Sequence, residues 1–364
     1  MKIKDVTTIL ETFAPLSYQE TYDNSGLIIG DRNDALKSIL VTLDCTEHVI
    51  DEAIKNKCNL IVAHHPIIFK AIKKLNGDDY IQRVIIKAIK HNIAIYAIHT
   101  NLDNVINGVN STIAKKLGLV NCKILQPKYD ILRQLIVYCP QSHSKQLRES
   151  LFSLGAGAIG SYEQCSFTSK GIGTFFPKNT SKPFAGKIGE LHEEPEDCLE
   201  MIFPKNIEAA IIECINKNHP YEEVAFQMFN LDIKYKNVGS GLIGELKESS
   251  EEEDFLFSLK KKMNTSSVRH TNLLNKKIKK VAVCGGAGSF LLSTAISQNA
   301  DIFISSDFKY HEFFDADNKL VVADIGHFES EQYTKGLIYD LLRKKITNFA
   351  VHLSQVNTNP INYI

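Results

Sequence analysis

The chain has 364 residues, of which 44% are hydrophobic and 23% are charged, as in an ordinary globular protein. Lys and Arg together number 42, as do Asp and Glu, so no net positive charge favours nucleic acid or an anionic membrane. No segment approaches the roughly 20 apolar residues of a membrane-spanning helix, and the first residues lack the apolar core of a signal peptide. The eight cysteines form no C-x-x-C pair, which predicts reduced core residues and a cytoplasmic protein.

Both ends of the chain alternate strand and helix patterns. In the first 120 residues the expected strands are 38–43, 59–63 and 93–98, and the expected helices are 46–57, 79–91 and 107–117. Near the carboxyl end the expected strands are 280–284, 301–305, 320–324 and 349–353, and the expected helices are 289–298 and 330–345. This alternation predicts an α/β fold with mainly parallel sheets. We therefore expect two related α/β lobes, at 1–126 and 236–364, or two halves of one layer.

The middle of the chain has a different texture. In order it shows an expected strand, helix, glycine-rich hairpin or strand pair, strand, helix and strand, at 131–138, 144–154, 155–177, 199–203, 207–216 and 224–231. The order β-α-β-β-α-β is the ferredoxin-like α+β signature. We therefore expect an inserted domain at 127–235. The HPYEE stretch at 219–223 is expected to shape a turn, and the acidic run 248–254 is expected to begin a surface helix.

Two adjacent histidines, His64 and His65, end the apolar run 60–63. Neighbouring strand residues point to opposite faces, so the two rings stay close only if the strand ends and the backbone turns there. Pro66 favours such a turn. Imidazole is the commonest metal ligand among side chains. The pair alone is a weak sign of a metal site.

Two further polar clusters follow parallel strands, where open α/β sheets place their sites. After 93–98 comes Asp103, a natural ligand, and His99, for which an orienting or packing role is favoured over ligation. After 320–324 come His327 and Glu331, which share one helix face because they are four residues apart. Glu329 points elsewhere and is expected to act as a helix amino-terminal charge.

Three histidines and two carboxylates exceed what one catalytic zinc ion uses. Two ions bridged by a carboxylate and a water would use all five residues, namely His64, His65, Asp103, His327 and Glu331. Mixed nitrogen and oxygen ligation suits Zn²⁺, with Fe²⁺ or Mn²⁺ also suitable. The alternative is that the three clusters are unrelated and never meet.

Three motifs carry a family resemblance: AHHPIIF at 63–69, HTNLD at 99–103 and DIGHFESE at 324–331. Together with YDNSGLIIG at 22–30 they resemble the GTP cyclohydrolase 1 type 2 homologues, also called NIF-three-like proteins, from about residue 4 to residue 360. The resemblance implies that the five residues above bind a dinuclear metal centre. It also implies a toroidal homohexamer with a PII/CutA-like insert. Tyr22 stands where the family usually has tryptophan.

Several further residues have more than one interpretation. His311, near Asp307 after the strand 301–305, is our candidate for proton transfer or substrate contact, with Glu331 as the second catalytic candidate. Asp23 and Asn24 either line the crevice or cap a turn. The glycine-rich stretch 284–289 is expected to be a tight turn rather than a phosphate site, because it lacks the P-loop lysine.

Two functions of different classes remain open. The first is a dinuclear metal-dependent hydrolase, in which metal-activated water attacks the ring of GTP, a nucleotide-like substrate, or a phosphoester. The second is a metal-binding scaffold or regulator whose insert senses a small molecule or a partner. Nucleic-acid binding is disfavoured by the zero net charge.

Overall fold

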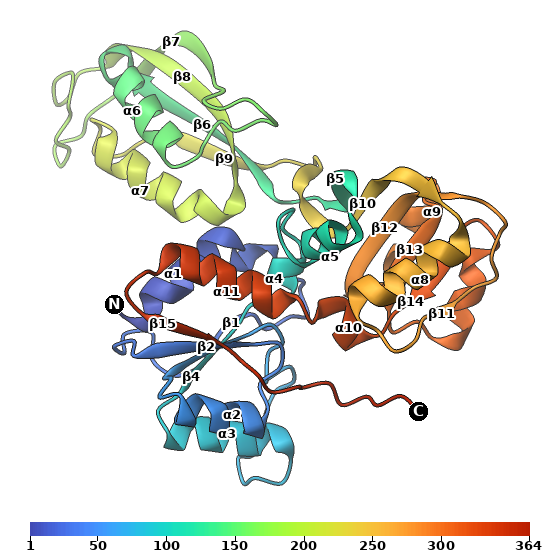
Figure 1. Cartoon of the computed structure of the whole chain (residues 1–364). Helices are drawn as coiled ribbons and strands as arrows, with labels where there is room; N and C mark the ends of the chain where they lie inside the picture. Colours follow the sequence, from blue (N-terminus) through green and yellow to red (C-terminus); the bar gives the residue numbers. More distant parts are fainter. The chain divides into compact units, whose positions relative to one another are not determined.

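The computed structural model describes residues 1–364, and the chain forms two units (Figure 1). The main unit combines Met1–Pro127 with Asn237–Ile364, and the inserted unit is Lys128–Lys236. The structure is a mixed α/β fold with three sheets, two in the main unit and one in the inserted unit. None of its helices combines the length and the apolar character needed to cross a membrane.

The first sheet of the main unit has five strands in the order β1 (Gly26–Ile29), β4 (Ala94–Ala97), β3 (Leu60–Ala63), β2 (Ser38–Thr42) and β15 (Ala350–Leu353). All neighbours are parallel except β1 and β4. Helices α2 (Glu47–Lys55) and α3 (Tyr80–Lys90) cover one face, and α1 (Ile3–Phe13) and α11 (Thr334–Lys345) cover the other (Figure 1). Covering on both faces explains why β2, β3 and β4 are continuous apolar runs.

The second sheet has six strands in the order β11 (Arg269–His270), β14 (Val321–Asp324), β13 (Ile302–Ser306), β12 (Ile278–Ala287), β10 (Tyr235–Ser250) and β5 (Val120–Lys128). Strands β12, β13 and β14 are parallel. The short helices η3 (Ser289–Leu291), α9 (Leu292–Ser297) and η4 (Tyr310–Ala316) pack over this sheet. Helices α5 (Val109–Leu117), α8 (Glu252–Met263) and α10 (His327–Glu331) complete it, and α5 and α10 contact β12.

The two terminal segments exchange strands between these sheets. The strand expected at 349–353 is β15, which lies beside β2 with Ala350 opposite Ser38. Conversely, β5 comes from the amino-terminal segment but lies in the second sheet. Neither sheet is therefore built from one end of the chain alone. The periodicity of a segment predicts its type of structure, whereas its partner is decided by packing.

Several expected elements differ in their bounds or number. The helix expected at 330–345 is two helices, α10 and α11, and the helix expected from 248 begins only at Glu252 because β10 continues to Ser250. Helix α1 and strand β1 were not predicted. Strand β1 has only four residues, whereas α1 carries a helical pattern in the sequence, with Ile3, Val6, Thr7 and Leu10 buried on one face.

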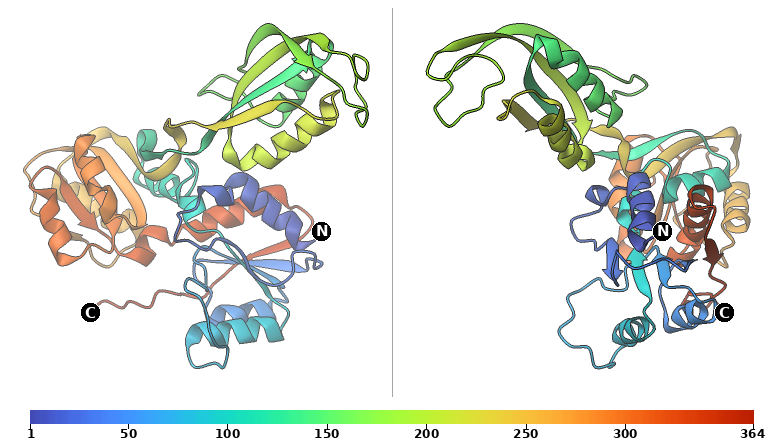
Figure 2. Two further views of the ribbon diagram at one scale, coloured as in Figure 1. Left: turned by 180° about the vertical axis from the view of Figure 1, so that it is seen from behind. Right: turned by 90° about the vertical axis from the view of Figure 1, so that its left-hand side faces the viewer.

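The inserted unit contains β6 (Leu132–Pro140), α6 (Gln141–Ser153), β7 (Phe167–Phe175), β8 (His192–Pro204), α7 (Glu208–Asn218) and β9 (Phe226–Asn230). Its sheet order is β7-β8-β6-β9 and every pair is antiparallel. Helices α6 and α7 lie side by side on one face of this sheet (Figure 2). The element order is thus the expected β-α-β-β-α-β. The stretch 155–177 forms one strand, β7, rather than a hairpin, because β7 takes β8 as its partner.

Candidate metal centre

His64 and His65 follow β3 directly, where the backbone turns. Both of their backbone N–H groups donate to the carbonyl of Leu43, at 3.0 Å each. The His64 ring is fully buried, and its Nδ1 donates to the carbonyl of Ile98 at 2.8 Å. Because a carbonyl only accepts, Nδ1 carries the proton and Nε2 presents a lone pair.

The lone pair of His64 meets a second polar atom without a partner. Asp103 ends α4 (Thr100–Asp103), and its Oδ1 lies 3.7 Å from His64 Nε2. Both atoms are buried and neither has a hydrogen-bond partner. A buried polar atom without a partner costs free energy. Two such atoms facing each other therefore indicate a binding position for a cation.

Glu331 links the histidines that follow β3 to His327 of α10. Gly326, at φ +88°, starts α10, and His327 and Glu331 lie one turn apart on this helix. Glu331 Oε2 lies 2.9 Å from His65 Nε2 and 3.1 Å from His327 Nε2. Its other oxygen, Oε1, lies 3.8 Å from His64 Nε2. The structure thus brings together all five residues that the sequence singled out.

The five residues form two groups that share Glu331. One group is His65, His327 and Glu331, and the other is His64, Asp103 and Glu331; within each, the possible ligand atoms all lie within 4.8 Å of one another. Each group offers nitrogen and oxygen donors from three residues, which is the number of protein ligands in a catalytic zinc site. The residues present therefore fit a pair of metal ions with Glu331 common to both.

A second layer of carboxylates orients the histidines. Asp44 Oδ1 accepts from His65 Nδ1 at 2.7 Å, and Asp307 Oδ2 accepts from His327 Nδ1 at 2.6 Å. This leaves Nε2 of each ring directed at Glu331. Histidines that bind metals typically bond through their other nitrogen in this way. Asp44 is not among the residues predicted from the sequence, although it follows the end of β2 at the same sheet edge.

The charges of the site are balanced by protons when no metal is bound. Burial alone would lower the pKa of the His65 and His327 rings, but Glu331, together with Asp44 at His65 and Asp307 at His327, outweighs it and raises the pKa of the two rings to about 10 and about 11. Burial would raise the pKa of Glu331, yet His327 and His65 hold it well below its usual range. Metal ions would therefore replace protons on these two rings, so their binding releases protons.

In the group of His64, Asp103 and Glu331 the pKa shifts favour the neutral forms of His64 and Asp103. Burial lowers the pKa of His64, so this ring is neutral. Burial and the neighbouring Glu331 raise the pKa of Asp103 well above its usual range. A cation bound between the two side chains would accept the lone pair of His64 and stabilise the ionised form of Asp103.

The glycine-rich carboxyl end of β12 makes room for Glu331. A Cβ atom at Gly286, where φ is +64°, would lie 2.4 Å from Glu331 Oε1. Two amides of this stretch donate within the chain: Gly286 N–H donates to Ser330 Oγ at 2.9 Å and Gly285 N–H donates to Asn110 Oδ1 at 2.9 Å. The absence of a Cβ atom at Gly286 allows the backbone to approach the carboxylate closely.

His99 completes the wall of the site. Asp23 Oδ1 accepts from His99 Nδ1 at 2.7 Å, and the His99 ring packs edge to face on those of His64 and His65, with centroids 5.3 Å away in each case. Burial would raise the pKa of Asp23, but its hydrogen bonds from His99 and Thr100 hold it well below its usual range. Asp23 therefore orients His99 without lining the pocket itself, and it also accepts from the backbone N–H of Asn24 at 2.7 Å, as a turn cap does.

The structure places His311 elsewhere. It is exposed on η4, where its ring contacts those of Tyr310 and Phe314 at 5.2 and 6.4 Å. It belongs to none of the groups that could hold a metal. Only Asp307, from the same segment, reaches the site, through His327.

A pocket of about 460 Å³ opens onto the histidines. Its polar side includes His65, His99 and His327, and its walls are apolar, with Phe69, Phe328, Pro66, Pro360 and Ile361. The carboxyl-terminal segment forms part of this wall and is anchored there. Thr358 Oγ1 donates to Asp44 Oδ2 at 2.5 Å, and Asn359 Nδ2 donates to Glu329 Oε1 at 3.1 Å.

Comparisons with known proteins show the family of the chain. The family model described as Duf34/NIF3 (NGG1p interacting factor 3) matches residues 1–360. Two relatives named GTP cyclohydrolase 1 type 2 homolog are each 38% identical: one from Bacillus subtilis, covering 99% of this chain and 98% of its own, and one from Halalkalibacterium halodurans, covering 100% of both. The solved structure of a Bacillus cereus protein related to NIF3 is 34% identical, covers 100% of this chain and 99% of its own, and has a TM-score of 0.87. The chain therefore belongs to the Duf34/NIF3 family.

Proposed function

We propose that the chain is a dinuclear metal-dependent hydrolase of the GTP cyclohydrolase type, acting on a nucleotide ring or a phosphoester. The observation that carries the proposal is the position of Glu331, with Oε2 beside His65 and His327 and Oε1 facing His64. Two divalent ions held there, with zinc the best fit to the mixed donors and iron or manganese as alternatives, would supply Lewis-acid catalysis and activation of water.

The chain's own residues would bind and orient the substrate. The apolar wall that includes Phe69 and Phe328 offers a surface on which a flat ring can lie. His99 presents its free Nε2 beside His64 and His65, while Asp23 holds Nδ1. We assign to His99 Nε2 the exchange of a proton with the substrate, a role for which His311 is poorly placed.

Turnover of a substrate panel tests this proposal. Zinc-loaded protein is expected to hydrolyse GTP, a related nucleotide or a phosphoester, with products separated by chromatography. Since a positioned proton-transfer group typically contributes at least about 100-fold, His99→Gln should lower kcat by about that factor while both ions stay bound. His91→Gln, on the exposed carboxyl end of α3, is the matched control and should match the parent protein.

Absence of turnover across the panel, with Glu331→Ala indistinguishable from the parent protein, would contradict the hydrolase assignment. The alternative, a metal-dependent scaffold, would then be supported if chelation dissociates an oligomer rather than only emptying the site. Metal binding is measured separately, and neither the turnover result nor the chelation result decides whether the metals bind.

We also propose that the protein is cytoplasmic and self-associates, as a toroidal hexamer. All eight cysteines are free, which suits a reducing compartment. Tyr310 and Phe314, on either side of His311, are 72% and 66% exposed. Neighbouring exposed aromatic side chains are typical of an interaction surface. The topology of the inserted unit supports its assignment as a PII/CutA-like domain.

A further inference from the structure

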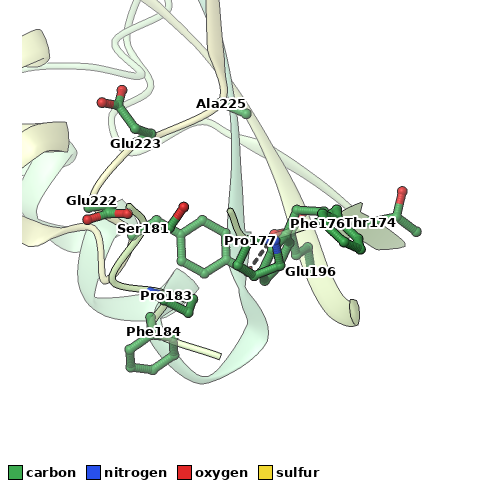
Figure 3. Close-up of a pocket in the computed structure, with 13 residues that line it drawn as sticks. Thr174, Phe176, Pro177, Ser181, Pro183, Phe184, Glu196, Glu222, Glu223 and Ala225 are labelled. Atoms are coloured by element: carbon green, nitrogen blue, oxygen red, sulfur yellow. Dashed lines mark hydrogen bonds between the residues drawn. The ribbon is translucent and has the colours of Figure 1, made fainter. Parts of the chain in front are cut away.

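The inserted unit contains a pocket of about 320 Å³ that the metal chemistry does not use (Figure 3). It lies where the end of β7, the loop that follows it, β8 and the loop before β9 meet. Figure 3 shows Phe176, Pro177 and Glu196 on one side and Pro183, Phe184 and Glu222 on the other. A pocket of this size is within the range of small-molecule sites.

Its walls are aromatic. The Tyr221 ring lies 5.6 Å from that of Phe175 and 6.3 Å from that of Phe184, centroid to centroid. Phe176 and Phe184 are 56% and 51% exposed, although both border the pocket. Ring faces that are left open carry negative electrostatic potential toward whatever enters.

Its charge is negative throughout. Three carboxylates line the pocket, Glu196, Glu222 and Glu223, and no lysine or arginine does. Glu196 is only 8% exposed, and its one hydrogen bond is from Tyr221 Oη to Oε1, at 2.8 Å. Glu196 forms no ion pair within the chain. Its other oxygen, Oε2, accepts no hydrogen bond within the chain, so this carboxylate has capacity for a cationic partner in the pocket.

The position of Glu196 is built into the fold. A Cβ atom at Gly173 would lie 2.3 Å from Glu196 Oε2, so the carboxylate rests directly against the backbone of β7. His219 fixes the other side, because its Nδ1 accepts from Tyr221 N–H at 3.0 Å and its Nε2 donates to the carbonyl of Tyr138 at 2.9 Å. The acidic and aromatic walls are therefore held in place before any ligand binds.

The two loops of the pocket are also tied to each other. Glu222 Oε1 accepts from the backbone N–H of Lys182 at 2.9 Å, which joins the loop after β7 to the loop before β9. This contact keeps Phe184 against Tyr221. Glu222 also lines the pocket, where its charge adds to the negative potential.

We propose that this pocket binds a small organic ammonium ion. Aromatic faces around a cation, with a buried carboxylate beside it, are the features that recognise quaternary and alkyl ammonium groups. A phosphate or a nucleotide would meet three carboxylates and no cation. A neutral apolar ligand would bury Glu196 further without compensating its charge.

The test uses the full chain and two probes of equal shape. Choline carries a quaternary nitrogen where 3,3-dimethylbutan-1-ol has a carbon, so the pair differs only in charge. Calorimetry should show choline binding, and the neutral probe binding at least about tenfold more weakly, because only choline has a positive charge to interact with the aromatic faces and the carboxylates. n-Butylammonium serves as a second cation.

Variants locate the binding. Glu196→Gln should weaken choline binding at least about tenfold, and Phe184→Ala, on the exposed wall, should weaken it without affecting the core. Glu193→Gln makes the same charge change on an exposed residue of β8 outside the pocket and should have no effect. Chelation of metal should also leave the affinity unchanged, which separates this proposal from the hydrolase.

Three results would overturn the proposal. One is that neither cation binds at millimolar concentration. Another is that the neutral probe binds as tightly as choline. The third is that Glu196→Gln and Phe184→Ala both match Glu193→Gln in affinity for choline.

Discussion

Replacing Glu331 by glutamine is expected to weaken both metal sites together. The carboxylate contributes one oxygen to the group with His65 and His327 and the other to the group with His64 and Asp103. Even the loss of an outer partner of a metal ligand costs about 10–100-fold in affinity, so losing a shared ligand should cost at least about 100-fold at each site. Calorimetric titration with zinc measures both affinities.

Glu329→Gln is the matched control for this change. Glu329 lies on the same helix and is 5% exposed, but its Oε1 accepts from Asn359 rather than facing the histidines. The Glu329→Gln variant should bind two ions with the affinity of the parent protein. If Glu331→Gln loses only one of the two ions, the shared role of Glu331 is wrong.

Gly286→Ala is expected to disrupt the same centre without removing any ligand. The new methyl group would lie 2.4 Å from Glu331 Oε1, and φ at this position is +64°, where an alanine costs roughly 1–2 kcal/mol. Either the Glu331 carboxylate must move or the backbone at residue 286 must change its conformation. Zinc affinity should fall at both sites, and urea denaturation should show a lower free energy of unfolding.

Gly336→Ala makes the same substitution in α11, where a Cβ atom would meet nothing within 4 Å. This variant should keep both ions and gain up to about 1 kcal/mol of stability, because alanine favours a helix interior more than glycine. Equal zinc affinity in the Gly286→Ala and Gly336→Ala variants would refute the role given to Gly286.

The sequence predicts the site well because strand ends are visible in it. His64, Asp103 and His327 each follow an apolar run, and parallel strands direct their carboxyl ends to one edge. The four-residue spacing of His327 and Glu331 predicts their shared helix face, which the structure shows. That the three clusters meet could not be derived from spacing, and only the resemblance pointed to it.

The remaining features depend on tertiary packing. The order of patterns along the chain carries no sign that β15 pairs with β2, or that β5 joins the other sheet. Asp44 orients His65 from 21 positions away in the sequence. The sequence does not show which acceptor bonds to the ring of His65. His311 resembled a site residue by its position after a strand, but η4 turns it to the surface.

The central claim is that two metal ions share Glu331. Anomalous diffraction from zinc-loaded crystals tests it most directly. The structure leads us to expect two zinc peaks per chain, one among His65, His327 and Glu331 and one among His64, Asp103 and Glu331. A single peak, or zinc bound away from these five residues, would contradict the account.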